Sequence, residues 1–448
     1  MKIKIDTDNM PIYKAASRYG GCRFHMPGHK ASPLMERLFG RAARLDITEL
    51  SFSDNLLDAK GAILEAERLC AKLYGAKRVK FGTCGSTVNI LSLIFSLRRR
   101  GGKLIIQKNS HASVYSALLL SGIEPVILDC ELNEDGLPKP PSPEQVREAA
   151  RQNPGCVGAL ITSPDYFGIL ADLNGIKEAL EGRLLLVDAA HGGHLPFMYN
   201  GVYQPADAYV VSAHKTLLGL TGASFTAFNN EELFEPFIES FRLFHSSSPS
   251  YPILASLDLS REVMEKNSLR LVAQLFEANS ALREKLEKLG YTFAKNLDFV
   301  KLVIKPPRGS GHSLYKKLEE RGVFLELSAP SCALALLSIT ETKREAGKLL
   351  KAFKEVLPLL EDDGRAKNLP DIRTQRAIPY LEAARAQRER VPLLKAAGRV
   401  AAANAGLYPP FYPLITCGEV LTPEVCRALA ESGEQAFGVD LGHIYVVK

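Results

Sequence analysis

The stretch Ser212-Ala213-His214-Lys215-Thr216 follows an apolar run, downstream of another apolar run that leads into Val187-Asp188-Ala189-Ala190-His191. A lysine on a short polar turn can form a Schiff base with an aldehyde cofactor, and an aspartate at the end of a buried strand can pair with a pyridinium nitrogen. The two elements together are the pattern by which a protein holds pyridoxal 5'-phosphate. This pair therefore predicts a pyridoxal-phosphate site.

Both residues also have a structural interpretation. Lys215 must be neutral to condense with an aldehyde, whereas a free lysine has a pKa of about 10.4. Burial beside a cationic ring lowers that pKa, and the alternative is an ordinary surface lysine. Asp188 is expected to keep the ring nitrogen protonated, which makes the ring an electron sink, or else to cap the turn into Ala189-Ala190. The presence of both residues favours the cofactor roles.

A glycine-containing turn upstream predicts where the cofactor phosphate binds. Gly82-Thr83-Cys84-Gly85-Ser86-Thr87 joins an apolar run to a helical one. Glycines let the backbone approach a ligand, and hydroxyl and N–H groups at a helix N-terminus favour an anion. The alternative is that Ser86 is only an N-cap. The turn is not a Walker A loop, because no Gly-Lys-Ser/Thr ends it.

Histidines near these elements are further candidates. His111 follows a predicted strand, where its ring can stack on the cofactor, and His191 can lie against the other face; a lone histidine is otherwise structural. Ser212 and His214 can contact the phosphate. The pairs His191/His194 and His25/His29 do not have the spacing of a zinc motif, and glycine or proline intervenes, so we expect no metal site.

Short apolar runs alternate with helical segments through the middle of the chain, which predicts an α/β fold with a mostly parallel sheet. Ligands bind outside the carboxyl ends of such strands. The predicted strands are Val79–Gly82, Leu104–Gln107, Pro125–Leu128, Val157–Thr162, Leu184–Val187, Ala208–Ser212 and Ser224–Phe228. The predicted helices are Thr87–Arg100, Ser113–Ser121, Pro143–Gln152, Leu173–Leu180 and a long one over Ser256–Leu289.

The chain of 448 residues is expected to comprise four parts. These are an N-terminal arm that packs on something else (1–50), a large domain (51–290), a small α/β domain (291–363) and a helical C-terminal region (364–448). The small domain is expected to contain strands at Phe299–Ile304 and Ala333–Ile339, and Glu361-Asp362-Asp363-Gly364 is expected to be a polar break.

Composition excludes several classes of protein. The net charge of +6 is spread along the chain, and Arg98-Arg99-Arg100 precedes two glycines as cations do at a helix C-terminus, so nucleic-acid binding is not expected. No stretch approaches the roughly 20 apolar residues of a membrane helix. The eight cysteines form no C-x-x-C pair and the N-terminus is not a signal peptide, which favours a reducing cytoplasm.

Taken together, the motifs resemble the Orn/Lys/Arg decarboxylase family, the group-III branch of fold type I pyridoxal-phosphate enzymes. The resemblance covers nearly the whole chain. It is carried by His25-Met26-Pro27-Gly28-His29-Lys30, Asp46-Ile47-Thr48-Glu49-Leu50, Leu73-Tyr74-Gly75-Ala76, Gly85-Ser86-Thr87, Asn109-Ser110-His111, Thr162-Ser163-Pro164, Asp188-Ala189-Ala190-His191-Gly192, Ser212-Ala213-His214-Lys215-Thr216 and Ser248-Pro249-Ser250-Tyr251.

The resemblance implies an aspartate aminotransferase-like large domain with a seven-stranded sheet, and a homodimer or multiple of dimers with active sites at the subunit interface. It implies that Lys215 carries the cofactor, Asp188 holds the ring nitrogen and His111 stacks. The further cofactor residues that it implies are Gly85, Ser86, Thr87, Ala190, His191, Ser212, His214 and, within Ser246–Ser248, Ser247. Larger members carry an N-terminal wing, so this chain resembles the short form.

Three positions depart from the family pattern. Gly222 stands where the family has glutamine, Phe411 replaces a glycine near the expected substrate position, and Cys417-Gly418-Glu419 replaces Pro-Gly-Glu. We expect decarboxylation of arginine, lysine or ornithine, with Lys215 or His214 returning the proton and Glu326 or Glu419 pairing with the distal cation of the substrate. The alternatives are an aminotransferase or β-lyase of the same fold, or a catalytically silent homologue.

Overall fold

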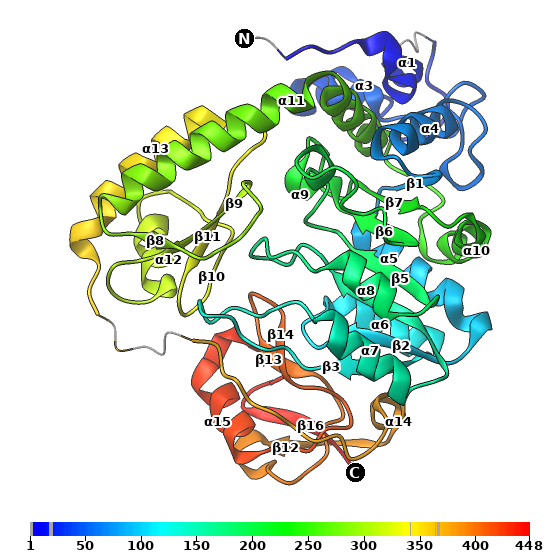
Figure 1. The fold of residues 1–448 in the computed structure, drawn as a ribbon. Helices are drawn as coiled ribbons and strands as arrows, with labels where there is room; N and C mark the ends of the chain where they lie inside the picture. The colour runs from blue at the N-terminus through cyan, green and yellow to red at the C-terminus, as the bar shows by residue number, and fades with distance from the viewer. Residues whose placement is uncertain (1–2, 18–20, 341, 363, 365–367) are drawn as a thin grey trace. The chain divides into compact units, whose positions relative to one another are not determined.

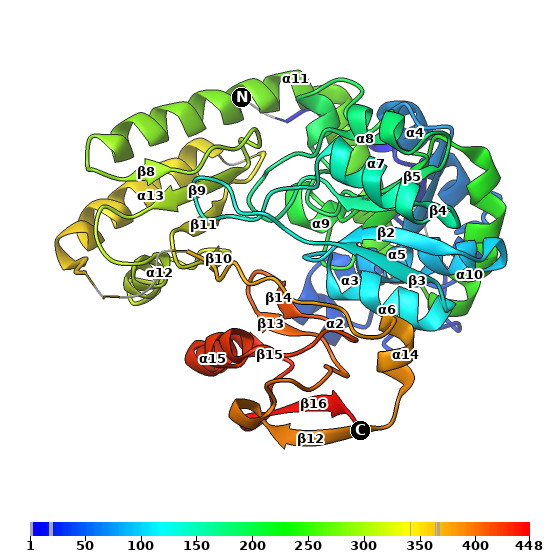
Figure 2. The ribbon, with the colours of Figure 1, turned by 60° about the horizontal axis from the view of Figure 1, so that its bottom comes forward.

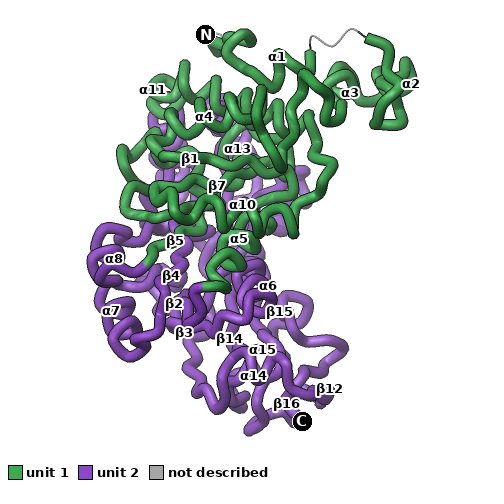
Figure 3. The backbone as a smooth tube through the Cα atoms, turned by 90° about the vertical axis from the view of Figure 1, so that its right-hand side faces the viewer, with its two compact units in different colours: residues 1–99, 184–273 green, residues 100–183, 274–448 purple. Residues whose placement is uncertain are grey.

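The computed structural model describes residues 3–17, 21–340, 342–362, 364 and 368–448. These residues form two compact units, and both are discontinuous in sequence (Figure 3). Unit 1 comprises residues 1–99 and 184–273, and unit 2 comprises residues 100–183 and 274–448. The division does not follow the four expected parts, because each unit takes some of the strands of the large sheet. The expected boundary at residue 363 falls on a position outside the described residues.

The main sheet has seven strands, in the order β1-β7-β6-β5-β4-β2-β3 (Figure 1). All seven predicted strands are present, within two residues of their expected bounds. They are β1 (Arg78–Gly82), β2 (Lys103–Gln107), β3 (Glu124–Leu128), β4 (Cys156–Thr162), β5 (Leu184–Asp188), β6 (Ala208–Val211) and β7 (Ser224–Phe228). β5, β6 and β7 are buried along their whole length, as their continuous apolar runs require.

Strand direction brings the candidate site segments of unit 1 to one edge of the sheet. β5 and β6 are parallel, whereas β7 is antiparallel to both β6 and β1. Consequently β1, β6 and β5 all point the same way, and the segments that follow them leave the sheet at the same edge. In unit 2, β2 is parallel to both β3 and β4.

The predicted helices flank these strands. In unit 1, α5 (Gly85–Ser96), continued by η3 (Leu97–Arg100), packs on β7 and on α10 (Phe234–Phe244), and α4 (Ala62–Tyr74) packs on β1. In unit 2, α7 (Pro143–Gln152) packs on α8 (Leu173–Ala179) and the strands. α7 begins at Ser142 in a reciprocal capping box with Gln145. α6 (Ala112–Ser121) ends at Gly122, whose φ of 73° closes the helix.

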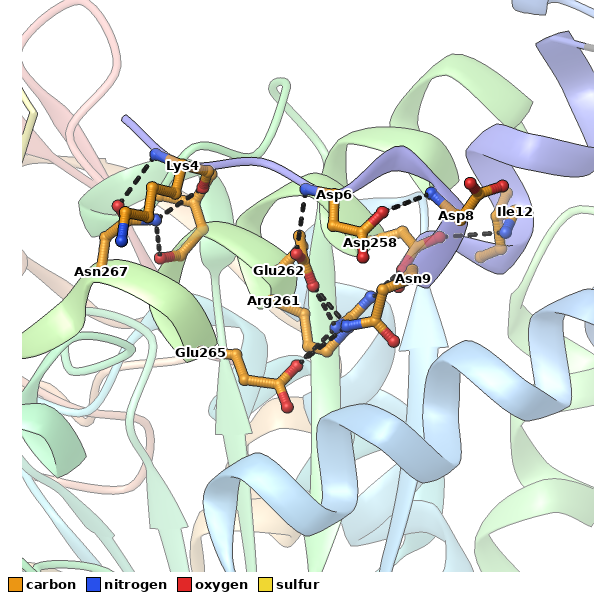
Figure 4. A network of polar contacts seen from close by, with 11 residues as sticks. Lys4, Asp6, Asp8, Asn9, Ile12, Asp258, Arg261, Glu262, Glu265 and Asn267 are labelled. Carbon is orange, nitrogen blue, oxygen red and sulfur yellow. Dashed lines mark hydrogen bonds and ion pairs between the residues drawn. The ribbon is translucent and has the colours of Figure 1, made fainter. Parts of the chain in front are cut away.

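The N-terminal segment is held by the chain's own long helix, α11 (Tyr251–Glu287), through a network of polar contacts (Figure 4). The Ile12 N–H donates to Asp258 (2.9 Å), the Asp6 N–H donates to Glu262 (3.1 Å), and Asn267 both accepts from and donates to the Lys4 backbone. The start of the expected arm therefore packs on its own subunit. Carboxylates on α11 accept from backbone N–H groups of this segment, and its apolar residues Met10, Ile12 and Ala16 are buried, so both kinds of contact order it.

That network contains more carboxylates than cations. Arg261 is 2% exposed and contacts Asp258 (2.9 Å), Glu262 (3.0 Å) and Glu265 (2.8 Å). Asp258 and Glu262 are completely buried. Burial raises the pKa of Asp258, and the hydrogen bond and charge of Arg261 oppose that rise.

The remaining elements of the arm are η1 (Thr7–Asn9), α1 (Pro11–Ser17), α2 (Pro33–Phe39), α3 (Ala42–Leu45) and, after it, η2 (Leu56–Asp58).

The small α/β region of unit 2 has a four-stranded sheet in the order β10-β11-β9-β8. Its strands are β8 (Thr292–Phe293), β9 (Lys301–Lys305), β10 (Leu327–Ser328) and β11 (Ala333–Leu336), and its helices are α12 (Gly311–Glu319) and α13 (Thr342–Val356). α13 lies beside the second half of α11 (Figures 1 and 2). Apolar residues of α11, α12, α13 and the sheet form one core cluster.

The C-terminal region is not helical, contrary to expectation. It contains two small sheets, β12 with β16 and β14-β13-β15, around one apolar cluster (Figure 2). Side chains of β12 alternate between exposed and partly buried, which is the pattern of a strand. Helical periodicity holds only over α14 and α15. The elements are α14 (Tyr380–Arg385), β12 (Arg388–Pro392), β13 (Ala405–Leu407), β14 (Tyr412–Ile415), α15 (Pro423–Ser432), β15 (Ala436–Phe437) and β16 (His443–Val447).

Short 3-10 turns complete the fold at η4 (Leu195–Phe197), η5 (Glu231–Leu233), η6 (Leu357–Leu359), η7 (Leu393–Lys395) and η8 (Gly433–Gln435). Among the described helices, none combines the length and apolar character that a membrane crossing demands.

Candidate active site

Three segments of unit 1 leave the same edge of the sheet and carry most of the candidate residues. Lys215 lies on α9 (Ala213–Thr216), a single turn directly after β6, and its N–H donates to the Ser212 carbonyl (3.1 Å). Nζ of Lys215 is 3.0 Å from Nε2 of His191, which follows β5 and is 5% exposed. The expected lysine and one of the expected histidines are thus in direct contact.

Asp188 ends β5 and is 4% exposed. Its Oδ1 accepts a hydrogen bond from the Ala190 N–H (3.1 Å), so it does cap the turn, as the structural alternative predicted. Within the described part of the chain, its Oδ2 makes no hydrogen bond. The Ser212 N–H donates to the Ala190 carbonyl (3.3 Å), which ties the ends of β5 and β6 together. A carboxylate oxygen that is left over on such a fixed turn can accept a bond from a ligand.

The turn before α5 meets the lysine segment through its side chains. Oγ of Ser212 donates to Oγ of Ser86 (2.7 Å), so two hydroxyls expected to bind phosphate lie together. Gly85 has a φ of 75°, which favours glycine, and its N–H donates to the Gly222 carbonyl (2.9 Å). Thr87 follows in the first turn of α5, where backbone N–H groups are not used by the helix.

Gly222, where the family has glutamine, is explained by its backbone. Its φ is 98°, and a Cβ there would lie 2.7 Å from the Thr83 carbonyl oxygen. A side chain at this position would therefore move the turn that Gly85 begins.

His214 is half-buried, and its Nδ1 donates to the Ala223 carbonyl (3.0 Å). Burial lowers the pKa of His214 and the neighbouring charge of Lys215 lowers it further, while the bond to Ala223 opposes this. The imidazole is therefore neutral at neutral pH, with the proton on Nδ1 and a basic Nε2.

One residue of this region was missed by the sequence argument. His245 is 6% exposed, its Nε2 accepts from the Thr83 N–H (3.1 Å) and its Nδ1 donates to the Ser246 carbonyl (2.8 Å). It joins the turn before α5 to Ser246–Ser248, in which Ser247 is exposed. The sequence signal for His245 is that it directly precedes Ser246–Ser248, the segment expected to contact the cofactor.

The other expected residues belong to unit 2. His111 is exposed and caps α6, accepting from the Ser113 N–H (3.2 Å). Glu326 is exposed, and its N–H donates to the Leu334 carbonyl. Glu419 is only 5% exposed, and its carboxylate already contacts several protein groups. Phe411, another of the three departures from the family pattern, stacks on Phe437 with ring centroids 4.4 Å apart.

The fold places this protein in a class. A mostly parallel seven-stranded sheet, a helix N-terminus with hydroxyls, a carboxylate at a strand end and a lysine after the next strand define the fold of the fold type I pyridoxal-phosphate enzymes. The unpaired Oδ2 of Asp188 and the hydroxyl pair Ser86–Ser212 fit the ring nitrogen and the phosphate of that cofactor.

The chain belongs to the Orn/Lys/Arg decarboxylase family. Residues 10–309 match the family described as Orn/Lys/Arg decarboxylase, major domain, and residues 363–430 match Orn/Lys/Arg decarboxylase, C-terminal domain. The expected family and fold class are confirmed.

Three similar proteins illustrate the relationship. The uncharacterized protein YaaO of Bacillus subtilis (strain 168) is 32% identical, over 94% of each chain. The arginine decarboxylase of the same organism is 28% identical, over 92% of this chain and 91% of the relative. The structure of lysine decarboxylase A from Pseudomonas aeruginosa has a TM-score of 0.83 at 20% identity and covers 98% of this chain and 80% of that one.

Proposed function

We propose that this protein is a pyridoxal-phosphate-dependent decarboxylase of a basic amino acid. The observation that carries the proposal is the 3.0 Å contact between Lys215 and His191 at the edge where Asp188 and Ser86 also lie. Family membership supports the reaction class.

Within this proposal the cofactor, when bound, supplies the electron sink that allows loss of carbon dioxide. Lys215 is its point of covalent attachment. His191 Nε2 lies 3.0 Å from Nζ of Lys215, where it can act as the base that takes up the proton released as the amine attacks. Oδ2 of Asp188 keeps a proton on the ring nitrogen, while Ser86, Thr87 and Ser212 hold the phosphate.

The reaction ends with proton return to the α-carbon. His214 and Lys215 are the two candidates for returning this proton, and because burial lowers the pKa of His214, its imidazolium would release a proton more readily than a free one. Gly85, Ala190 and Ser247 contribute by backbone or hydroxyl contacts to the cofactor, and His111 stacks on its ring.

Arginine is the first substrate to test, with lysine and ornithine next. The relatives that span more than nine-tenths of this chain include one named arginine decarboxylase. Glu326 is exposed and can meet a distal guanidinium or ammonium. The contacts of Glu419 point to another role, which is developed below.

We further propose a homodimer, or a multiple of dimers, in the cytoplasm. Support comes from exposed large apolar side chains on the segment 24–39, which water would otherwise contact. They are Phe24 (95% exposed), Met26 (66%), Leu34 (56%), Leu38 (65%) and Phe39 (64%). The eight cysteines are all free thiols, in keeping with a reducing compartment.

The deciding experiment measures carbon dioxide release by purified, cofactor-loaded protein from a panel of amino acids. Release from a basic amino acid, lost in Lys215→Ala, supports the proposal. Amino-group transfer or β-elimination without carbon dioxide release would instead indicate an aminotransferase or β-lyase. If none of these three activities is found, the protein is a catalytically silent homologue.

A further inference from the structure

A charge network in unit 2, with buried Lys108 and Glu419 at its centre, ends at the turn that carries His111. Lys108, at the end of β2, is 5% exposed, although it carries a long cationic side chain. Its Nζ lies 3.3 Å from Oδ1 of Asp129 and 3.3 Å from Oε2 of Glu419, and it donates to Oγ1 of Thr374 (3.0 Å). A buried ammonium needs such partners, because desolvation is costly otherwise.

Both carboxylate oxygens of Glu419 contact protein groups. Its Oε2 accepts from the Thr374 hydroxyl (2.8 Å) and the Thr416 N–H (2.8 Å) and contacts Lys108, while its Oε1 lies 3.2 Å from Arg376. Two cations, Lys108 and Arg376, thus face two carboxylates, Asp129 and Glu419. The network is neutral as it stands, and no further cation is required to balance it.

Lys108 is fixed at its backbone as well. Its N–H donates to the Leu128 carbonyl (2.8 Å), and its carbonyl accepts from the hydroxyl of Tyr115 on α6 (2.6 Å). The Ser110 N–H closes the turn on the Gln107 carbonyl (2.9 Å), and His111 follows as the cap of α6. The ammonium and the peptide of Lys108 therefore anchor one short turn from both ends.

We propose that Glu419 is a positioning residue, which acts through Lys108 to fix the turn 108–111 and so the ring of His111. The proposal rests on the proposed function, in which His111 stacks on the cofactor. It replaces the expectation that Glu419 pairs with the distal cation of the substrate. A carboxylate that binds substrate must give up protein partners to the ligand. Glu419 has four protein partners, and the loss of these contacts would oppose substrate binding.

The two roles predict different losses on Glu419→Gln. If Glu419 binds the substrate, the substitution should mainly raise KM, and by different factors for arginine and lysine, because their distal cations differ in shape. If Glu419 is a positioning residue, the substitution should leave the ratio of the two KM values unchanged, lower kcat for both substrates and weaken cofactor binding.

The experiment uses E419Q, K108M and the double variant, with E431Q as the control. Glu431 is an exposed carboxylate on α15 of the same region. The first readout is hydrogen exchange of the backbone amides of residues 108–114, which requires neither cofactor nor substrate. We expect exchange there to rise about tenfold in E419Q and K108M, to be no faster in the double variant than in K108M, and to be unchanged in E431Q.

Thr374→Val is a milder variant that removes only the bridging hydroxyl, and it is expected to accelerate exchange in the same amides if E419Q does not fold. Unchanged exchange at 108–114 in E419Q, or in T374V should E419Q be unfolded, overturns the proposal. So does additive behaviour of K108M and E419Q.

The second readout is the dissociation constant of pyridoxal phosphate, expected to rise in E419Q and K108M. Accelerated exchange with unaltered cofactor affinity would overturn the link to His111. If the parent protein released no carbon dioxide from any basic amino acid, the proposed function would fail, while the exchange data would still decide whether Glu419 fixes the turn.

Discussion

Nζ of Lys215 and Nε2 of His191 lie 3.0 Å apart, and the two residues come from segments that follow the neighbouring parallel strands β6 and β5. The contact depends on the Ser212 N–H bonding the Ala190 carbonyl, because this bond holds the two segments in register. An amine placed against a basic nitrogen is suited to nucleophilic attack.

Borohydride reduction of the cofactor-loaded protein should fix the cofactor on Lys215, and peptide mass spectrometry should find it there. Lys215→Ala should still bind the cofactor but not turn over, because the other contacts remain. Lys316→Ala, which removes a lysine of α12, serves as the control and should behave as the parent. Recovery of the cofactor on another lysine would refute the assignment.

Asp188→Asn should lower kcat, because a neutral amide does not keep the ring nitrogen protonated. The expected loss corresponds to a rise of roughly 3–4 kcal/mol in activation free energy. The thermal midpoint should change little, since an amide oxygen can still accept from the Ala190 N–H. Steady-state kinetics and thermal unfolding measure the two effects. Parental activity in this variant would leave Asp188 as a cap alone.

His214 should make the protein less stable in mild acid. Its pKa is lowered from the ordinary 6.5, so the unfolded state binds the proton more tightly than the folded state. Its contribution to the free energy of unfolding is present above pH 6.5 and is lost as pH falls from there toward the lowered pKa. Urea unfolding of His214→Gln across this range should show a smaller pH dependence than the parent, and equal slopes would contradict the prediction.

Arg261→Met should destabilise the protein by about 3–5 kcal/mol, because it leaves buried Asp258 and Glu262 without their cation. Urea unfolding measures the loss, with Lys266→Met, an exposed neighbour on α11, as the control. A loss no larger than that of the control would show that the carboxylates are satisfied by the N-terminal backbone alone.

Phe24→Ser combined with Leu38→Ser should weaken self-association and activity together, if the segment 24–39 lies at a subunit interface near the active site. Substitution is preferable to deleting residues 1–30, which would also remove the contacts of Lys4 to Ile12 with α11. Analytical ultracentrifugation and activity measured at matched concentrations provide the test. A fully active monomer would exclude the shared site and leave Lys215 and Asp188 unaffected.

Local signals were sufficient for the sheet and for the residues after its strands. Runs such as Leu184–Val187 are apolar on both faces, Asp188 follows that run directly and Lys215 lies on the turn after Ala208–Ser212, so the sequence predicts strand ends and candidate residues together. Ser86 and Ser212 meet because β1 and β6 point the same way, so the segments after them leave the sheet at one edge.

Long-range partners could not be predicted. Glu419 looks like any carboxylate in the sequence, and only the fold shows that it lies on Lys108, Thr374 and Arg376. The C-terminal region has strands of two to five residues, and β12 alternates in exposure but not between apolar and polar residue types, so its two helices set the sequence pattern. The arm was expected to need a foreign surface, because nothing near it in sequence indicated carboxylates on α11.

The N-terminal network also bears on synthesis of the chain. Lys4, Asp6, Asn9 and Ile12 bond to residues on α11 that are 246 to 263 positions away. These bonds cannot form until the stretch 258–267 has left the ribosome and become helical, whatever contacts α1 makes with α4 before then. Unit 1 therefore cannot close until residues 258–267 are translated, and the backbone groups of Lys4, Asp6 and Ile12 stay open to water, chaperones and proteases throughout that interval.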